Sequence, residues 1–340
     1  KSVCVTTVFE PYFFVKLPRG TTDQDVRVLF NDINNIKSDH VTSYSIVEKK
    51  DVWGFQNNEK FAYMRLNFKT LVDRRKVASV FNYNNKFRKY HLYEANIDPV
   101  LRLMHRTGIQ STGWIDTGSD CVRSHLAKVD IDLWCNDWQT LKPVDRDDIA
   151  PFVVASVDIE CNSSTGKFPD ANVPDDACFQ IAISLCTFGN DEPYEKVCLC
   201  YKKTEGPDVV SFDTEREMLE AFQKYIHEKD IDIITGWNIF GFDLEYMYTR
   251  AHMVDCSPEF FNLGKLHDPP SELLMKKLSS SALGDNFLKL LPMSGRFIFD
   301  LFHEVKKGYK LDSYKLNEVS KLYLGDQKID MPPKEMFARF

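Results

Sequence analysis

Two acidic side chains, Asp158 and Glu160, directly follow an apolar run of strand length at residues 152–157 (FVVASV). Side chains two apart in a strand point to the same face, so both carboxylates are expected to project together at the end of a strand. Two like charges cost free energy there unless a cation or a proton compensates them. Carboxylate oxygens suit Mg²⁺ or Mn²⁺, so the pair indicates a metal site. The alternative is a solvated strand end, which the same residue types also fit.

The second candidate is the segment GWNIFGFD at residues 236–243, which follows a predicted strand and opens a predicted helix. Asp243 is expected near the N-terminus of that helix, where a negative charge is favoured. Taken alone, this position favours a helix cap over a metal ligand. Together with Asp158 and Glu160, Asp243 completes three carboxylates on adjacent strand and helix ends. Such a set could build a site for two metal ions.

The elements predicted in the first half of the chain are those of a small α+β domain. Aromatic and β-branched runs predict the strands, and apolar residues at helical spacing predict the helices. The polar, acidic stretch at residues 143–148 (PVDRDD) is typical of a domain junction. We therefore expect an N-terminal domain at 1–150 and a second domain at 151–340. The predicted elements of the first half are strands at 9–17 and 61–68 and helices at 22–33 and 72–81.

The second half alternates strands and helices around the candidate carboxylates. The run at 152–157 fits a central strand that is buried on both faces. Thr214 and Glu217 form a capping box at the start of a helix with an apolar stripe. The order of three strands, a helix, a strand and a helix is compatible with a ribonuclease-H-like mixed sheet. The other predicted elements are strands at 179–188, 196–201 and 231–235 and a helix at 243–252, the first two strands forming a hairpin.

Composition excludes several classes of protein. Hydrophobic residues make up 43% and charged residues 27% of the chain, which is typical of a globular protein and excludes disorder. No apolar run reaches about 18 residues, so no membrane-spanning segment is expected. The nine cysteines are scattered and form no C-x-x-C pair. This argues against a disulfide framework or a zinc site and for a reducing compartment.

Charge is divided unevenly between the halves. Residues 1–150 carry a formal net charge of +3 and residues 151–340 carry −10, which together give the −7 of the whole chain. A passive nucleic-acid binder is usually basic, whereas an acidic half leaves room for carboxylates whose charge a divalent metal offsets. Because the chain begins with Lys1 instead of Met, we expect it to be an internal piece of a longer protein.

The two acidic motifs resemble those of a known family. Asp-Ile-Glu at 158–160, after an apolar strand, resembles the first exonuclease motif of family B DNA polymerases, and residues 236–243 resemble the second, N-x-x-x-F-D. Residues 324–337 are similar to the polymerases of large DNA viruses, including algal ones. The other segments that resemble the delta-type branch of the family are residues 92–102, 113–115, 295–300 and 309–317.

The resemblance implies a role for each site residue. Asp158 would bridge two Mg²⁺ (or Mn²⁺) ions, Glu160 would bind one of them and position the attacking water, and Asp243 would hold the second. Asn238 and Phe242 would hold the substrate strand or the shape of the site. For Phe242, packing in the core is an equal alternative.

The resemblance also implies a fold and partners. Residues 151–340 would form a ribonuclease-H-like 3′–5′ exonuclease domain, α/β in class and incomplete at its C-terminal end, behind an α+β domain at 1–150. The partner would be DNA, with the primer 3′ end single-stranded in the site, and the template strand. A sliding clamp could bind through a part beyond Phe340. The location implied is intracellular, either the nucleus or a viral replication compartment, with no membrane partner.

The chain departs from the family pattern in two places. The third exonuclease motif, Y-x-x-x-D, and the aspartates of the polymerase palm are absent from it and are expected beyond Phe340. Residues 314–318 read Y-x-x-x-E, but they resemble the helix that precedes that motif. We therefore expect weak or no nuclease activity from residues 1–340 alone. The alternatives are a stand-alone exonuclease of the same DEDD type and a non-catalytic scaffold that binds nucleic acid.

Other candidate residues are more consistent with structural roles. The basic segments 74–76 and 86–90 interleave with aromatic residues and could contact template, but a solvated face over an aromatic core is favoured. His252 and His303 lack metal-ligand spacing, so both are interpreted as structural. Asp300 follows an apolar, strand-like run and is interpreted as a helix cap.

Overall fold

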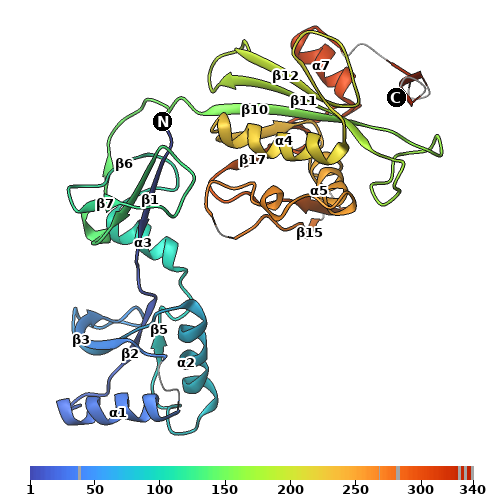
Figure 1. Cartoon of the computed structure of the whole chain (residues 1–340). Coiled ribbons are helices and arrows are strands. Elements are labelled where there is room, and N and C mark those ends of the chain that lie inside the picture. Colours follow the sequence, from blue (N-terminus) through green and yellow to red (C-terminus); the bar gives the residue numbers. More distant parts are fainter. Residues whose placement is uncertain (37–39, 268, 281–283, 328–330, 333–334, 338–340) are drawn as a thin grey trace. The chain divides into compact units, whose positions relative to one another are not determined.

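A computed structural model describes most of the chain, namely residues 1–36, 40–267, 269–280, 284–327, 331–332 and 335–337. The chain divides into two units, and Figure 1 follows its course by colour. The first unit comprises Lys1–Cys4, Arg123–Asp132 and Asp148–Phe340, and the second comprises Val5–Val122 and Leu133–Asp147. Residues 151–340 thus lie in one unit, while residues before 148 contribute to both. The assignment of 1–150 and 151–340 to two domains stays a prediction.

The second unit contains a four-stranded antiparallel sheet in the order β3-β4-β2-β5. Alternate residues of β2 and β4, such as Phe13 and Met64, form a core with the apolar stripes of two helices. Thr70 caps the second helix by accepting the N–H of Asp73. The predicted strands and helices of this half are confirmed. Their bounds are β2 Tyr12–Lys16, α1 Asp23–Ile36, β3 Ser43–Lys50, β4 Lys60–Asn67, α2 Leu71–Tyr83 and β5 Leu92–Tyr93.

Smaller elements follow along the chain. Asp98 caps a short helix, which ends at Gly108 in the left-handed conformation. Three strands form a sheet in the order β1-β8-β7, and two more form a pair, β6 with β9. These elements are β1 Val3–Thr7, α3 Pro99–Thr107, β6 Trp114–Asp116, β7 Cys121–Arg123, β8 Ile131–Cys135, a 3₁₀ turn at Trp138–Thr140 and β9 Lys142–Val144.

The first unit is built on a mixed six-stranded sheet in the order β13-β12-β11-β10-β14-β17. β10 pairs antiparallel with β11 and parallel with β14, which in turn pairs parallel with β17. β10 is therefore an interior strand of a mixed α/β arrangement. The strands are β10 Val153–Cys161, β11 Cys178–Thr187, β12 Glu195–Tyr201, β13 Val209–Phe212, β14 Ile233–Gly236 and β17 Phe297–Asp300.

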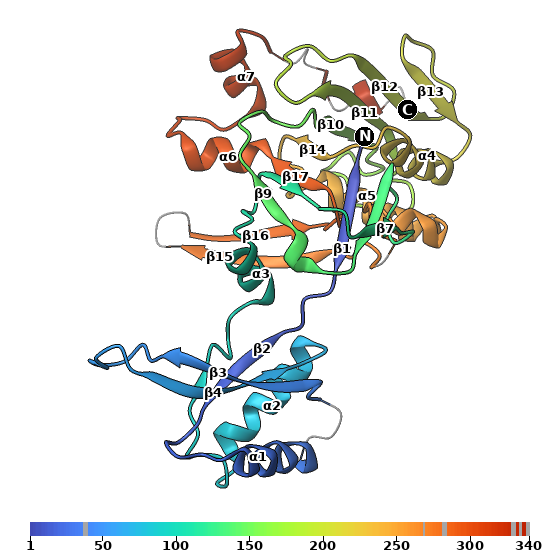
Figure 2. The ribbon, with the colours of Figure 1, turned by 90° about the vertical axis from the view of Figure 1, so that its left-hand side faces the viewer.

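Two helices cover one face of this sheet. Phe222 of α4 and Met247 of α5 belong to the same buried cluster as Val157 and Ile159 of β10. Figure 2 shows a long hairpin, β15–β16, whose strands pair antiparallel. None of the helices in the described residues is long and apolar enough to cross a membrane. The remaining bounds are α4 Glu215–Glu228, α5 Asp243–Met253, a 3₁₀ turn at Pro258–Phe261, β15 Leu274–Ser280, β16 Gly284–Leu290, α6 Leu301–Gly308 and α7 Leu316–Leu324.

Most predicted elements of the second half are confirmed, including the β11–β12 hairpin and the capping box of Thr214 and Glu217. Two expectations were wrong. β13 adds a fourth strand before the first helix, and β10 is not buried on both faces, because Ser156 and Asp158 are exposed. The run at 152–157 was interpreted as nearly continuously apolar, although the alternation of buried and exposed residues already begins within it, at Ser156. The virus-like segment 324–337 lies partly outside the described residues.

Candidate functional site

Asp158 and Glu160 lie on the same face of β10, as predicted. Val157, Ile159 and Cys161 alternate with them and are buried, whereas Asp158 is exposed and Glu160 is half-buried. The apolar residues hold the strand against α4 and α5, which leaves both carboxylates on the opposite face. β10 therefore carries two acidic side chains on one face, close to its C-terminal end.

Asp243 is brought to β10 from a distant part of the sequence. It is the first residue of α5 and is 4% exposed. Its Oδ1 accepts the N–H of Ile159 at 3.2 Å, so the carboxylate is attached to β10 between Asp158 and Glu160. The alternative of a helix cap is wrong, because the N-cap position is occupied by Phe242, which makes no side-chain cap.

The carboxyl group of Asp243 is difficult to ionise in this fold. Burial and, secondly, the negative charge of Asp158 raise the pKa of Asp243 to about 7; the charge of Asp300 adds to this. Ionisation of this carboxyl group near neutral pH is therefore costly unless a positive charge is added. The oxygen-only donors Asp158 and Asp243 suit a hard divalent cation such as Mg²⁺ or Mn²⁺. The donor chemistry of these two side chains is that of the predicted metal, although among the described residues they do not make up a complete ligand set.

The structure does not gather all three predicted ligands into one group. In the part of the chain that it describes, no cluster of three or more His, Cys, Asp or Glu side chains is close enough to hold a metal ion. Asp158 and Asp243 interact electrostatically, and Glu160 lies two residues further along β10. The ligand roles of Asp158, Glu160 and Asp243 stay a prediction.

Glycines allow the tight turn that leads from β14 into α5. A Cβ on Gly236 would lie 2.4 Å from the carbonyl oxygen of Val157, so only glycine permits this approach of β14 to β10. A Cβ on Gly241 would meet the side chain of Asn238 at 2.4 Å. Asn238 has a φ of 63°, and its carbonyl accepts the N–H groups of Gly241 and Phe242. Asn238 thus closes the turn, and any contact of its side chain with substrate stays a prediction.

Asp300 is a helix cap, as predicted, and it also binds the turn before Asp243, which the sequence did not reveal. Its carboxylate accepts the N–H of Phe302 in α6 and, in addition, the N–H groups of Asn238 and Phe240 in the turn before Asp243. Asp300 is 2% exposed. The parallel pairing of β14 with β17 brings it opposite Gly236, which no local pattern in the sequence could indicate.

Comparison with known proteins identifies the family. Residues 90–319 match the family model for the exonuclease domain of DNA polymerase family B. This chain belongs to DNA polymerase family B. The matched residues include Asp158, Glu160 and Asp243, and the match confirms the predicted family.

Relatives in this family are viral and eukaryotic polymerases. The chain is 32% identical to the DNA polymerase of Paramecium bursaria Chlorella virus NY2A, over 100% of the chain and 38% of that protein. It is 29% identical to the DNA polymerase delta catalytic subunit of Dictyostelium discoideum, over 97% of the chain and 32% of that protein. The chain thus spans about a third of the length of these relatives. The predicted likeness to delta-type and large-virus polymerases is confirmed.

A pocket of about 410 Å³ opens beside Glu160 of this family B chain. Lys167, Phe168 and Phe242 are among the residues that line it. The ring centroids of Phe168 and Phe242 lie 5.2 Å apart, and Phe168 is 77% exposed. An exposed aromatic ring beside a carboxylate can stack on a base. Sequence reasoning missed Phe168 because it lies in a loop without periodic pattern.

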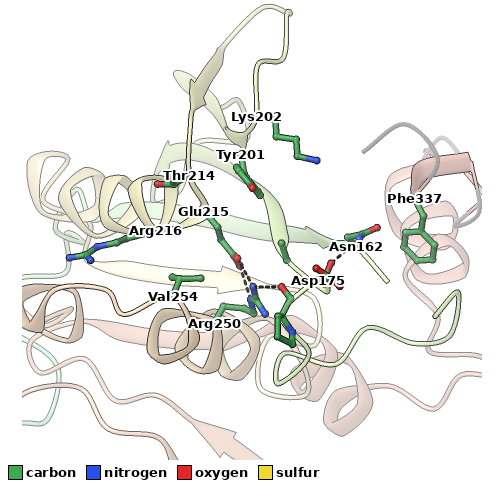
Figure 3. A pocket seen from close by; sticks show the side chains of 12 residues that line it. Asn162, Asp175, Tyr201, Lys202, Thr214, Glu215, Arg216, Arg250, Val254 and Phe337 are labelled. Atoms are coloured by element: carbon green, nitrogen blue, oxygen red, sulfur yellow. Dashed lines mark hydrogen bonds and ion pairs between the residues drawn. The ribbon is translucent and has the colours of Figure 1, made fainter. Parts of the chain in front are cut away.

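The loop that carries Phe168 is tied to the two helices of the site. Figure 3 shows Arg250 of α5 paired with Glu215 of α4, at 2.6 Å between Nη2 and Oε2. The same guanidinium donates to the carbonyl of Pro174 in the loop, and Glu215 accepts the N–H of Cys178. Both side chains are buried. This pair, which the sequence analysis missed, connects the segment after Glu160 to α5.

The basic and aromatic segments of the second unit form the predicted core only in part. Phe81 and Phe87 are buried, while Arg75 and Lys89 of the same segments are exposed. Arg74 is the exception among the cations, since it is buried and donates to the carbonyl of Ile97. The interpretation as a solvated face over an aromatic core is confirmed for Phe81 and Phe87, but not for Tyr83, which is 82% exposed, or for the buried Arg74.

The remaining candidates are structural in this family B chain. His252 stacks on Phe261 with ring centroids 4.3 Å apart, and His303 lies 4.0 Å from the carboxylate of Asp300. The hydroxyl of Tyr314 donates to a backbone carbonyl at 2.9 Å, and Glu318 lies in the first turn of α7.

Proposed function

We propose that residues 151–340 form a ribonuclease-H-like 3′–5′ exonuclease domain, which proofreads within a replicative DNA-directed DNA polymerase. The observation that carries this proposal is the attachment of Asp243 to β10 between Asp158 and Glu160. The mixed sheet with β10 in its interior supports the fold. The family model, which is that of the exonuclease domain, supports the activity.

The three carboxylates would hold two Mg²⁺ (or Mn²⁺) ions. Asp158 would contact both ions, Glu160 one and Asp243 the other, with Glu160 also orienting the attacking water. The ions, when bound, would stabilise negative charge on the attacking and leaving oxygens of the phosphodiester. Burial of Asp243 and its proximity to Asp158 make its ionised form unfavourable, and a bound cation would offset this cost.

The substrate would be the single-stranded 3′ end of a primer. Phe242 and Phe168 line the pocket beside Glu160, where an aromatic face can stack on the terminal base. Asn238 would keep the turn in the shape that places Phe242 there. A mispaired terminus unstacks at lower cost than a paired one, so it would enter the site more often.

Properties of the whole protein are also proposals, because the chain spans about a third of its relatives. We place the third exonuclease motif and the palm beyond Phe340, and we expect residues 1–340 alone to show weak or no excision. The partners would be primer and template DNA, with a sliding clamp bound through the downstream part. The site of action would be the nucleus or a viral replication compartment.

The test is the double variant Asp158→Ala with Glu160→Ala in the protein expressed from the full reading frame. We expect excision of a mismatched primer to fall by at least about a thousandfold, while polymerisation on a matched primer is retained. Excision at the wild-type rate would refute the assignment of these carboxylates to an exonuclease site, whereas no excision by the wild-type protein itself would favour a non-catalytic scaffold. Loss of excision in a protein that shows no polymerisation at all would favour a stand-alone exonuclease.

A further inference from the structure

The carboxylate of Asp300 accepts three backbone N–H groups from two separate elements. Its Oδ1 accepts from Asn238 at 2.9 Å and from Phe302 at 3.0 Å, and its Oδ2 accepts from Phe240 at 2.9 Å. The side chain is 0% exposed, so water does not compete for these bonds. Hydrogen bonds to an ionised acceptor are stronger than those between neutral groups. One bond caps α6, and the other two hold the turn at residues 237–242.

Strand pairing explains why Asp300 reaches this turn. β14 and β17 run parallel, and their register places Asp300 opposite Gly236, the last residue of β14. Beyond Gly236 the chain turns at once, with Asn238 at positive φ. The N–H groups of Asn238 and Phe240 have left the ladder of the sheet and bond to Asp300 instead. Without Asp300 these part-buried donors would lose the acceptor they have in this fold.

The turn sets the starting point of α5. Within the turn, the carbonyl of Asn238 accepts the N–H groups of Gly241 and Phe242. From outside it, Lys289 of β16 donates its backbone N–H to the carbonyl of Phe240 at 3.3 Å. The helix then begins at Asp243, whose carboxylate reaches the N–H of Ile159. A shift of the turn would therefore move Asp243 along or away from β10.

We propose that Asp300 is a positioning residue of the exonuclease site, which fixes the turn at 237–242 and so determines where Asp243 lies relative to Asp158. The inference rests on the proposed function. Asp300 acts through the backbone of the turn, because its two oxygens accept three amide N–H groups.

The test is Asp300→Asn in the protein expressed from the full reading frame. Asparagine keeps the size of the side chain but has only one acceptor oxygen. Its NH₂ group, itself a donor, must then face an N–H of the turn or of α6, so at least one of the hydrogen bonds is lost. We expect kcat for excision of a single-stranded 3′ end to fall about 10–100-fold, with KM changed less than about threefold. The Kd for Mn²⁺, measured by electron paramagnetic resonance without DNA, should rise about tenfold.

Asp98→Asn is the matched control. Asp98 caps α3 through a single bond, to the N–H of Val100 at 2.8 Å, and one asparagine oxygen can replace it. Excision and Mn²⁺ binding should stay within about twofold of wild type. If Asp300→Asn does not fold, Asp300→Glu gives the same two readouts, because it keeps both oxygens but moves them by one methylene.

Two results would overturn the proposal. One is wild-type kcat and Mn²⁺ Kd in the Asp300 variant, whether or not its thermal midpoint falls, since a simple helix cap predicts a lower midpoint with both values unchanged. Loss of Mn²⁺ binding as complete as in Asp243→Ala would make Asp300 a ligand. If Asp158→Ala with Glu160→Ala also leaves excision intact, the proposed function itself fails; if that variant alone loses excision, only the inference about Asp300 fails.

Discussion

Replacing Asp243 by asparagine is expected to stabilise the protein above neutral pH when divalent metal is removed. Asp243 is 4% exposed, and burial, followed by the charge of Asp158, raises its pKa from 3.8 to about 7. The unfolded chain releases this proton near the ordinary pKa, whereas the folded chain keeps it until about pH 7. Stability therefore falls as pH rises from about 4 to about 7, and it stays low at higher pH.

The size of this effect follows from the pKa difference. From 3.8 to about 7, at about 1.36 kcal/mol per pH unit, the ionised carboxylate costs roughly 4 kcal/mol of the free energy of unfolding. Asparagine has no charge to desolvate, and its side-chain oxygen can still accept the N–H of Ile159. Asp243→Asn should thus gain up to about 4 kcal/mol at pH 8 and almost nothing at about pH 4. The same change should abolish excision, which is a trade of activity for stability.

The assay is urea unfolding in EDTA at about pH 4.5 and pH 8, with hydrogen exchange of β10 and α5 peptides to report on this unit. Asp191→Asn, an exposed residue between β11 and β12, is the matched control and should change neither value. Adding Mg²⁺ at pH 8 should stabilise wild type more than Asp243→Asn. Equal stabilities of wild type and Asp243→Asn at pH 8 in EDTA would refute the reasoning.

Two further predictions concern the neighbours of the carboxylates. Arg250→Met leaves Glu215 buried without its partner, since the side chains of the pair are 3% and 5% exposed, and it should lower the free energy of unfolding in urea by about 3–5 kcal/mol. Adding Glu215→Leu should restore part of this stability. A loss below about 1 kcal/mol in Arg250→Met would contradict the reasoning. Phe168→Ala should raise KM for single-stranded DNA about 5–100-fold and leave stability unchanged, because Phe168 is 77% exposed. The control is Phe55→Ala, which should leave KM unchanged, since Phe55 is 92% exposed and lies in the other unit. Equal effects of the two substitutions on KM would refute a stacking role for Phe168.

Local patterns in the sequence were sufficient to predict most elements and the family. Alternation of polar and apolar residues placed Asp158 and Glu160 on one face of β10, and the capping box of Thr214 and Glu217 located the start of α4. These features depend on residues within a few positions of one another, so the sequence displays them directly. The two acidic motifs likewise lie within short segments, and their resemblance to family B polymerases was confirmed.

The arrangement of the site was decided by contacts between distant segments. The bond from Ile159 to Asp243 joins residues 84 positions apart, and the bonds from Asp300 to the turn span about 60 positions. The pairing of Arg250 with Glu215, and the exposed face of β10, likewise depend on which strands and helices become neighbours. Sequence patterns report the periodicity of one segment, whereas strand pairing and burial set pKa values and hydrogen-bond partners. For this reason the sequence alone could name the carboxylates, and only the folded sheet could show which of them act on one another.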